Sequence, residues 1–238
     1  MAANNTETRR GGAARPEETR AKLIQTGLRL FGSHGFESVT TRMLANEAGV
    51  NQASIPYHFG GKEGLYRAVC EDVVQQVRMH VGMLSGEMDK IFQAAPTPQK
   101  AAAAALRQLY RSFFNGVLRE QNAKDRFLFM IREYQDPGVG FDIIYEGALQ
   151  TMHQSISLIA AAALTLEPES EEAMIRGHVL LGQMFGFMGA RSILLRRLNW
   201  ETYTEENISV ILEAVTEMGL CALGLPLDGE QLHTKEES

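Results

Sequence analysis

The apolar residues of the chain recur at helical spacing along almost its whole length, and no run of alternating β-branched residues indicates a strand. From about Glu17 to His34, for example, Leu23, Leu28 and Phe31 fall on one face, and Gly35 follows as a stop signal. This spacing predicts an all-α fold of about nine helices. We expect them at about residues 17–34, 41–48, a short helix capped by Asn51, 62–83, 101–118, 124–135, 141–164, 171–197 and 204–223.

The charge balance changes sign along the chain. Residues 1–66 carry 8 Lys and Arg against 6 Asp and Glu, whereas residues 67–238 carry 15 against 23, so a mildly basic head precedes an acidic body. Cys70 and Cys221 are far apart and lie in no CxxC motif. This cysteine usage indicates neither a disulfide framework nor a metal site and favours a cytoplasmic location, and no cofactor is expected.

Three segments bear on targeting and on the ends of the chain. Residues 1–16 are small, polar and basic and lack the apolar region of a secretory signal, so we expect a disordered tail there. Residues 226–238 are expected to be flexible. The stretch from Gly147 to Leu166 has no formal charge, but its Gln, His, Ser and Thr residues indicate a buried helix, and we expect no membrane segment.

Two short helices joined through Ala48, Gly49 and Val50 suit a helix-turn-helix, in which the first helix braces the second against DNA. Small Ala45 allows the two helices to approach closely, and Gly49 can adopt the positive φ of a tight turn. The front of the chain is therefore a candidate DNA-binding element, although such a helical pair can also serve packing alone.

The third expected helix has a polar and aromatic outer face. Unrolled at about 100° per residue with Ile55 inward, it directs Ala53 and Tyr57 outward and leaves Pro56 on a shoulder of the outer face. Tyr57 and His58 can donate hydrogen bonds to phosphates, and small residues admit close approach to a groove. This face therefore favours DNA contact, with His58 alternatively packed as a partly buried histidine.

The stretch TTRMLANEAGVNQASIPYHFGGKEGLY resembles the DNA-binding motif of TetR-type transcriptional regulators, through AxxAGV, YHF and KExL at these spacings. The resemblance covers about residues 18–68. The segments FMIREYQDPGVGFD, ISLIAAAAL and ILLRRLNW are similar to the CecR/YbiH-like subgroup of that family. The resemblance implies a helix-turn-helix domain over residues 17–66 and a helical effector-binding and dimerisation domain over residues 67–225.

The resemblance also implies a function and a set of DNA contacts. The expected function is that of a repressor that binds a palindromic operator in double-stranded DNA as a homodimer, is released by a small hydrophobic or amphipathic effector, and controls transporter or efflux genes. Position by position, the implied contacts are Thr41 with a phosphate, Arg42 with a base edge, Gln52, Ala53 and Ser54 at the start of the recognition helix, Tyr57 and His58 with backbone and groove, and Lys62 with a phosphate.

Pro56 departs from the family, which usually has an aromatic or polar residue at this position. Deep in a helix, a proline that lacks the N–H for the Gln52 carbonyl would cost about 3 kcal/mol. Because Pro56 follows Asn51 so closely, a 3₁₀-like or bent first turn would limit that cost. We expect its ring to be a rigid apolar contact at the DNA groove.

The uncharged stretch GHVLLGQMFGFMGA, residues 177–190, predicts a helix that is buried on both faces, with a stripe of small residues that lets another helix approach closely. The last helix supplies a second apolar stripe. Two helices from each of two subunits would form a four-helix interface, and a large monomer with one very apolar core helix is the alternative. The expected interface residues are His178, Gly182, Gly186, Gly189 and Ile193, with Ile208, Leu212 and Val215 on the last helix.

Met and aromatic residues at helical spacing predict either an ordinary core or an apolar effector pocket, for which flexible Met side chains are well suited. Arg132 and Arg191 lie near these residues, and each would form an internal ion pair or orient a ligand. The candidate pocket residues are Phe113, Phe114, Phe127, Met130, Arg132, Tyr134, Met184 and Phe187.

Two other functions compete with a ligand-responsive regulator. One is a DNA-binding dimer without an effector, and the other is a helical enzyme or lipid carrier. The sequence has no nucleophile elbow, P-loop, HExxH motif or dinucleotide fingerprint, so no enzymatic activity is expected.

Overall fold

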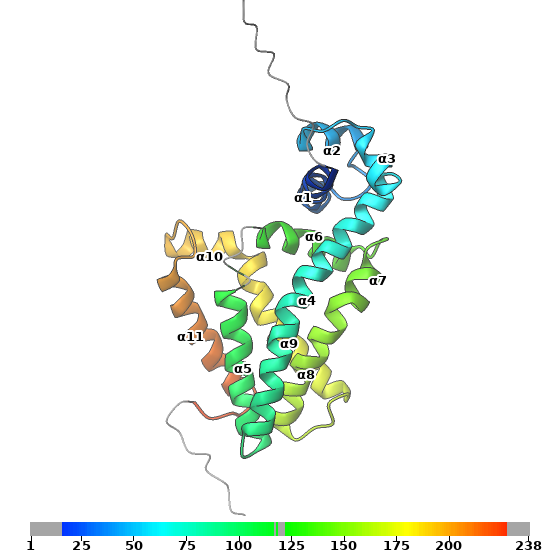
Figure 1. Cartoon of the computed structure of the whole chain (residues 1–238). Coiled ribbons are helices and arrows are strands. Elements are labelled where there is room, and N and C mark those ends of the chain that lie inside the picture. The colour runs from blue at the N-terminus through cyan, green and yellow to red at the C-terminus, as the bar shows by residue number, and fades with distance from the viewer. Residues whose placement is uncertain (1–15, 117, 119–121, 228–238) are drawn as a thin grey trace, which may run out of the picture. The chain divides into compact units, whose positions relative to one another are not determined.

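The computed structural model describes residues 16–116, 118 and 122–227, and every regular element in these ranges is helical (Figure 1). Of the tails expected at residues 1–16 and 226–238, residues 1–15 and 228–238 lie outside the described residues, and Pro16 belongs to a helix rather than to the expected tail. The chain divides into two compact units, and the boundary between them in the sequence lies between Val69 and Cys70. The expectation of an all-α fold is confirmed.

The first unit contains the expected short helices. Its elements are α1 (Pro16–His34), α2 (Thr41–Ala48), α3 (Ser54–Phe59) and the start of α4 (Lys62–Ala94). Phe31 of α1 is fully buried, and its ring lies 4.9 Å from that of Tyr66 in an edge-to-face arrangement. The spacing of buried residues on α1 follows the apolar stripe seen in the sequence, so burial of that stripe holds α1 against its neighbours.

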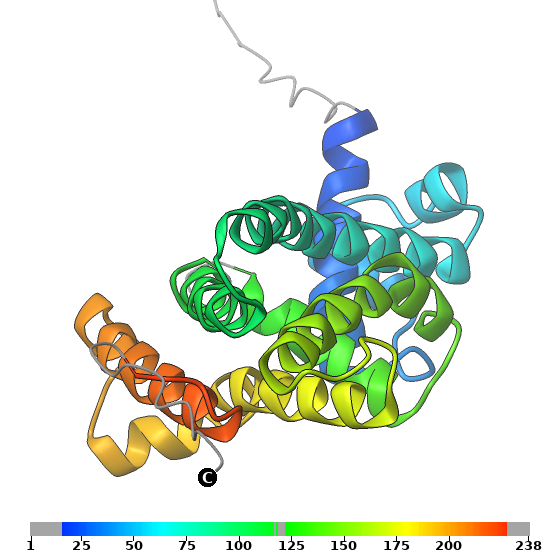
Figure 2. The ribbon, with the colours of Figure 1, turned by 90° about the horizontal axis from the view of Figure 1, so that it is seen from below.

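The second unit contains the rest of α4 and the remaining helices. These are α5 (Pro98–Asn115), α6 (Ala123–Gln135), α7 (Phe141–Ile144), the π-helical turn η2 (Tyr145–Leu149), α8 (Gln150–Leu164), α9 (Glu171–Gly189), α10 (Arg191–Leu198) and α11 (Glu205–Ala222). Helix α8 packs along α9, as Figure 2 shows, and also against α5, which in turn packs against α11.

Glycine permits two of these close helix contacts. A Cβ on Gly177 of α9 would come within 2.8 Å of the Ser157 hydroxyl on α8. A Cβ on Gly219 of α11 would come within 2.8 Å of the Tyr110 hydroxyl on α5. Both distances are shorter than ordinary packing allows, so these helices approach closely because the glycines have no side chain.

Several helix boundaries differ from the expectation. Helix α4 continues to Ala94 rather than ending near Met83, because buried Leu84 and Met88 hold it to the core while Gly82 and Gly86 face solvent. Helix α5 covers residues 98–115 rather than 101–118, because Thr97 caps it at its N-terminus. The side-chain oxygen of Thr97 accepts a hydrogen bond from the Lys100 amide.

Two helices expected to be continuous are interrupted. The segment 141–164 contains the π-helical turn η2, and the segment 171–197 is divided at Ala190 into α9 and α10, which are bent by 64°. Among the described residues no single helix is long and apolar enough to cross a membrane, and α9 with α10 meets that test only as this bent pair, by length and composition.

Candidate nucleic-acid interface and associated sites

A left-handed glycine joins the two helices of the helix-turn-helix. Gly49 has φ 65° and ψ 35°, and its amide donates to the carbonyls of Ala45 and Asn46 at the end of α2. At the other end of α2, the Thr40 hydroxyl accepts a hydrogen bond from the Met43 amide. Fully buried Leu44 and Ile55 lie beneath the motif, so α3 has a defined inner side.

The turn before α3 has 3₁₀-like hydrogen bonds. The Ser54 amide donates to the Asn51 carbonyl at 2.9 Å, and the Ile55 amide donates to the Gln52 carbonyl at 3.2 Å. The Asn51 side chain accepts from the Ala53 amide at 2.8 Å, so it stabilises this turn rather than capping α3 directly as expected. Helix α3 begins later than the sequence indicated, because this turn replaces its expected first residues.

Pro56 is therefore only the third residue of α3. The first N–H groups of a helix have no acceptor within it, so the missing N–H leaves no hydrogen bond unmade. The carbonyl of Gln52, which an amide at position 56 would otherwise meet, already accepts from Ile55. The hydrogen bonds confirm the expected 3₁₀-like turn, and accommodation of the proline ring by this turn stays a prediction.

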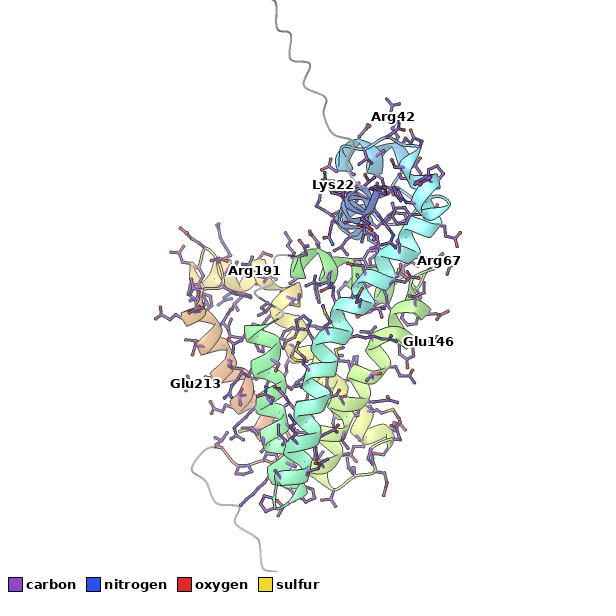
Figure 3. All side chains as sticks on the ribbon, in the orientation of Figure 1. Lys22, Arg42, Arg67, Glu146, Arg191 and Glu213 are labelled. Atoms are coloured by element: carbon purple, nitrogen blue, oxygen red, sulfur yellow. The ribbon has the colours of Figure 1, made fainter. Side chains whose placement is uncertain are left out.

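The outer face of the motif is exposed. Tyr57 has 80% of its surface exposed, and its ring lies edge-to-face with that of His58 at 4.8 Å. Pro56 and Ala53 are exposed beside it. Arg42 projects from α2 on the side away from α1 (Figure 3), and exposed Met43, which was not among the predicted contacts, follows it on the same helix.

The remaining predicted DNA contacts are linked to the scaffold. Gln52 donates from its side-chain nitrogen to the Thr41 hydroxyl at 3.0 Å, which joins the turn before α3 to the start of α2. The Lys62 ammonium donates a hydrogen bond to the backbone carbonyl of Phe36 at 3.0 Å, and it lies 4.1 Å from the centroid of the Phe36 ring. An ammonium has three N–H donors, so this single bond leaves Lys62 able to meet a phosphate. Ser54 is half-buried.

On α9 the small-residue stripe lies at the surface. His178, Gly182, Gly186 and Gly189 are exposed. No heavy atom lies within 4 Å of a Cβ built on Gly182 or Gly186, so these positions have room for a neighbouring helix. Ile193 is also exposed, but it lies on α10 beyond the bend and so does not continue the α9 stripe as expected.

The expected interface on α11 needs correction. Ile208 and Val215 are only 2% and 3% exposed, because this apolar stripe packs into the core of its own chain, and Leu212 is half-buried against that core. The large apolar side chains that α11 presents to solvent are Val210 and Met218. The prediction that these residues share one face of the helix is confirmed, but that face packs against α5 of the same chain rather than against a partner subunit.

A small cavity of about 90 Å³, the inner chamber, lies among α4, α5, α6, η2, α8 and α9. Three predicted residues line it, namely Phe113, Phe127 and Met130. The other lining residues were not predicted from the sequence, because some come from α4, η2 and α8, and those of α6 and α9 are identified only by how these helices pack. They are Gln76, Val77, His80, Ala123, Arg126, Leu149, Met152, Phe185 and Met188.

The other predicted pocket residues do not line the inner chamber. Phe114, Met184 and Phe187 belong to the core between α5 and α9, where the rings of Phe114 and Phe187 lie 5.3 Å apart. Arg132 is exposed because it points away from the face of Phe127 and Met130. Tyr134 lies outside the lining, and burial raises the pKa of its phenol.

Arg126 is the cationic residue that lines the inner chamber. Burial lowers the pKa of its guanidinium, and the neighbouring Asp72 carboxylate acts in the opposite direction. The charge of Arg126 is thus balanced locally by Asp72, and the rest of the lining is mainly apolar. The inner chamber suits an apolar group.

The exposed face of α3, the turn at Gly49 and the buried residues Leu44 and Ile55 beneath the motif define a DNA-binding protein of the helix-turn-helix class. The chain belongs to the TetR family of transcriptional regulators, with a CecR-type C-terminal domain. Residues 23–69 match the family described as bacterial regulatory proteins, tetR family, and residues 102–224 match the C-terminal domain of the HTH-type transcriptional dual regulator CecR. Proteins of this family are transcriptional regulators that bind DNA.

Individual relatives agree with this assignment. The chain is 28% identical over 219 residues to the HTH-type transcriptional dual regulator CecR of Shigella flexneri, which covers 90% of this chain and 93% of that protein. A TetR-family regulator from Streptomyces coelicolor superposes with a TM-score of 0.58 at 21% identity, over 87% of this chain and 95% of that one. AibR, solved with isovaleryl coenzyme A and operator DNA, superposes with a TM-score of 0.58 at 15% identity, over 84% of this chain and 97% of that one. Both structures therefore share the fold of this chain.

Proposed function

We propose that the chain is a repressor that binds a palindromic operator as a homodimer through α2 and α3, and that a small hydrophobic or amphipathic effector releases it. The observation that carries this proposal is the contrast on the short helix α3, where Ile55 is fully buried while Tyr57 is 80% exposed. An aromatic side chain presented on a braced helix suits a groove or phosphate contact.

Each proposed contact has a distinct role. Arg42 reads a base edge, because an exposed guanidinium at the start of α2 can reach into the groove and form two parallel hydrogen bonds with guanine. Tyr57 and His58 contact backbone and groove from α3. Lys62 holds a phosphate at the start of α4, where its bond to Phe36 fixes its position.

Dimerisation is proposed through the exposed faces of α9 and α11. The glycines of α9 admit a partner helix, and the exposed apolar side chains Ile175 and Val179 flank them on the same helix. On α11 the contacts come from Val210 and Met218 rather than from the buried stripe. A two-fold arrangement would present two α3 helices to the two half-sites of a palindrome.

Release is proposed to act through α4. This helix contributes Val77 and His80 to the inner chamber, and the same helix begins at Lys62 beside the DNA-binding motif. An effector that prefers one position of α4 would shift the population of dimers away from the spacing that fits the operator. The proposed targets are transporter or efflux genes.

The test begins with selection of bound sequences from random duplex DNA, followed by titration of the selected operator in fluorescence anisotropy. Tyr57→Ala should weaken operator binding about 5- to 150-fold, because a contact worth about 1–3 kcal/mol is lost. Tyr145→Ala, which removes an exposed tyrosine of the second unit, is the matched control and should bind as the unmodified chain does. Equal affinity of the Tyr57→Ala variant would contradict the proposed interface.

A second candidate is a DNA-binding dimer without an effector. The small volume of the inner chamber favours it, because ligand pockets in proteins are typically about 300–1,000 Å³. A thermal-shift screen separates the two candidates, since a ligand that both raises the melting temperature and changes operator affinity exists only for the first. Because CecR of Shigella flexneri is named a dual regulator, a reporter gene placed behind the selected operator should be scored for activation as well as repression.

A further inference from the structure

A second and larger cavity adjoins the inner chamber. This outer chamber, of about 420 Å³, lies between α6, the end of α9 and α10. Ala123, Phe127 and Met188 line both cavities. These three side chains therefore form the wall that separates the two chambers, and the outer chamber alone has the volume of an ordinary ligand site of about 300–1,000 Å³.

The separating wall consists of movable side chains. The Phe127 ring lies edge-to-face with Phe185 at 5.6 Å, and a Cβ built on Gly189 would lie 3.5 Å from the tip of the Phe127 ring. Glycine at position 189 thus leaves space beside the ring. Met188 has a flexible side chain that changes rotamer readily. A ligand that occupied both chambers would displace the side chains of Phe127 and Met188.

The described residues that line the outer chamber include two cations. Lys124 of α6 and Arg191 of α10 line it together with Ser192, and Figure 3 shows Arg191 where α10 begins. Of the described residues that line this chamber, none is Asp or Glu. Because residues 67–238 as a whole carry more acidic than basic residues, two cations in one cavity of this acidic body favour an anion locally.

Neutral groups hold Arg191 in place. Its guanidinium donates to the Thr202 hydroxyl at 2.9 Å and lies 4.8 Å from the centroid of the Tyr203 ring. These partners order the side chain without cancelling its charge. A guanidinium held in this way is prepared for a charge-assisted hydrogen bond to a carboxylate, sulfonate or phosphate.

We propose that the two chambers form one site for an anionic amphiphile. Its anionic group binds Lys124 and Arg191 in the outer chamber, and its apolar chain crosses the wall so that only its far end occupies the inner chamber of about 90 Å³. This orientation follows from the charges of the described lining, in which Asp72 balances Arg126 at the inner chamber and none of the residues around the outer chamber is Asp or Glu. The inference rests on the proposed function, in which an effector binds this domain.

Isothermal titration calorimetry on the full chain without DNA tests the site with three probes of equal chain length, namely decanoate, decanol and decyltrimethylammonium, each below its aggregation concentration. Decanoate should bind at least tenfold more tightly than decanol, and the cationic probe should not bind. From hexanoate to decanoate, affinity should rise about fourfold for each added methylene that is buried among the apolar side chains of the two chambers.

Two charge-removing variants locate the anionic group. Arg191→Gln should weaken decanoate binding about tenfold, and Lys124→Gln, at an exposed side chain, about two- to fivefold, with decanol binding unchanged in both. Arg191→Lys should restore part of the affinity. Arg196→Gln removes an exposed cation of the same helix that does not line either chamber, so it is the matched control and should bind decanoate normally.

Equal affinity for decanoate and decanol would overturn the proposal, as would unchanged decanoate binding in a Lys124→Gln, Arg191→Gln double variant. If circular dichroism shows that Arg191→Gln disturbs folding, the decanoate affinity of Lys124→Gln alone tests the proposal, and unchanged affinity in that variant would overturn it. Failure of the proposed function is distinguishable, because it is measured separately by adding decanoate to the protein–operator complex. Charge-dependent decanoate binding that leaves operator affinity unchanged would support the site and contradict its role in release.

Discussion

The free energy of unfolding of a Pro56→Ala variant shows whether the proline strains α3 or is accommodated by it. If the ring distorted α3, its removal would stabilise the protein by up to about 3 kcal/mol, the cost of a proline inside a helix. The hydrogen bonds predict the opposite sign. The Gln52 carbonyl already accepts from Ile55, so an alanine amide at position 56 gains no unoccupied acceptor there.

The expected magnitude comes from the unfolded chain. Proline at a position that fits its fixed φ stabilises a protein by about 0.4–1 kcal/mol, because it restricts the unfolded state. We therefore expect Pro56→Ala to lower the free energy of unfolding by about 0.4–1 kcal/mol. Thr40→Ala, which removes the side-chain cap of α2, should lower it by about 1 kcal/mol and calibrates the same unit.

Urea unfolding followed by far-UV circular dichroism measures both variants, and hydrogen exchange of the α2 and α3 amides assigns the change to the first unit. An increase of about 2 kcal/mol or more in Pro56→Ala would refute the view that the 3₁₀-like turn accommodates the ring. Operator titration reports the groove contact separately. A few-fold loss of affinity in Pro56→Ala is expected if the ring touches DNA, and unchanged affinity and sequence preference would remove that contact.

Two further predictions concern the second unit. Gly219→Ala should destabilise the protein by about 1–3 kcal/mol, because its Cβ would press on buried Tyr110, whereas Gly86→Ala at an open site of α4 should stabilise it by up to about 1 kcal/mol; equal melting temperatures would contradict this. Burial, and secondarily His178, lowers the pKa of His153, so the folded state favours its neutral ring and stability should fall as the pH drops below about 6.5. In urea unfolding at several pH values, His153→Gln should reduce this loss of the free energy of unfolding at acidic pH. An unchanged pH dependence would exclude His153 as its source.

The sequence predicted elements that local signals define and missed those that tertiary contacts define. Helix α2 has the expected bounds because Thr40 and Gly49 mark its ends by cap and turn chemistry. The bend at Ala190 has no comparable signal, since neither proline nor a turn motif marks it. The late start of α3 depends on how the Asn51 turn closes, which residue preferences alone did not specify.

The candidate sites show the same division. The helical period correctly separated Ile55 from Tyr57 because both lie on one short helix whose inner side is fixed by an obvious apolar residue. For α11 the period identified an apolar stripe but not its partner, which is α5 of the same chain. The chambers were harder to predict, because Met152 and Phe185 meet Phe127 only through the packing of separate helices.

The central claim is that two copies of α3 read two halves of one operator. Its most direct test is titration of the chain with the selected palindrome and with a duplex in which one half is scrambled, with stoichiometry measured by analytical ultracentrifugation. We predict two or another even number of chains per palindrome, affinity at least a hundredfold weaker for the scrambled duplex, and weaker binding of the palindrome by Tyr57→Ala. One chain per duplex with equal affinity for both DNAs would contradict the claim.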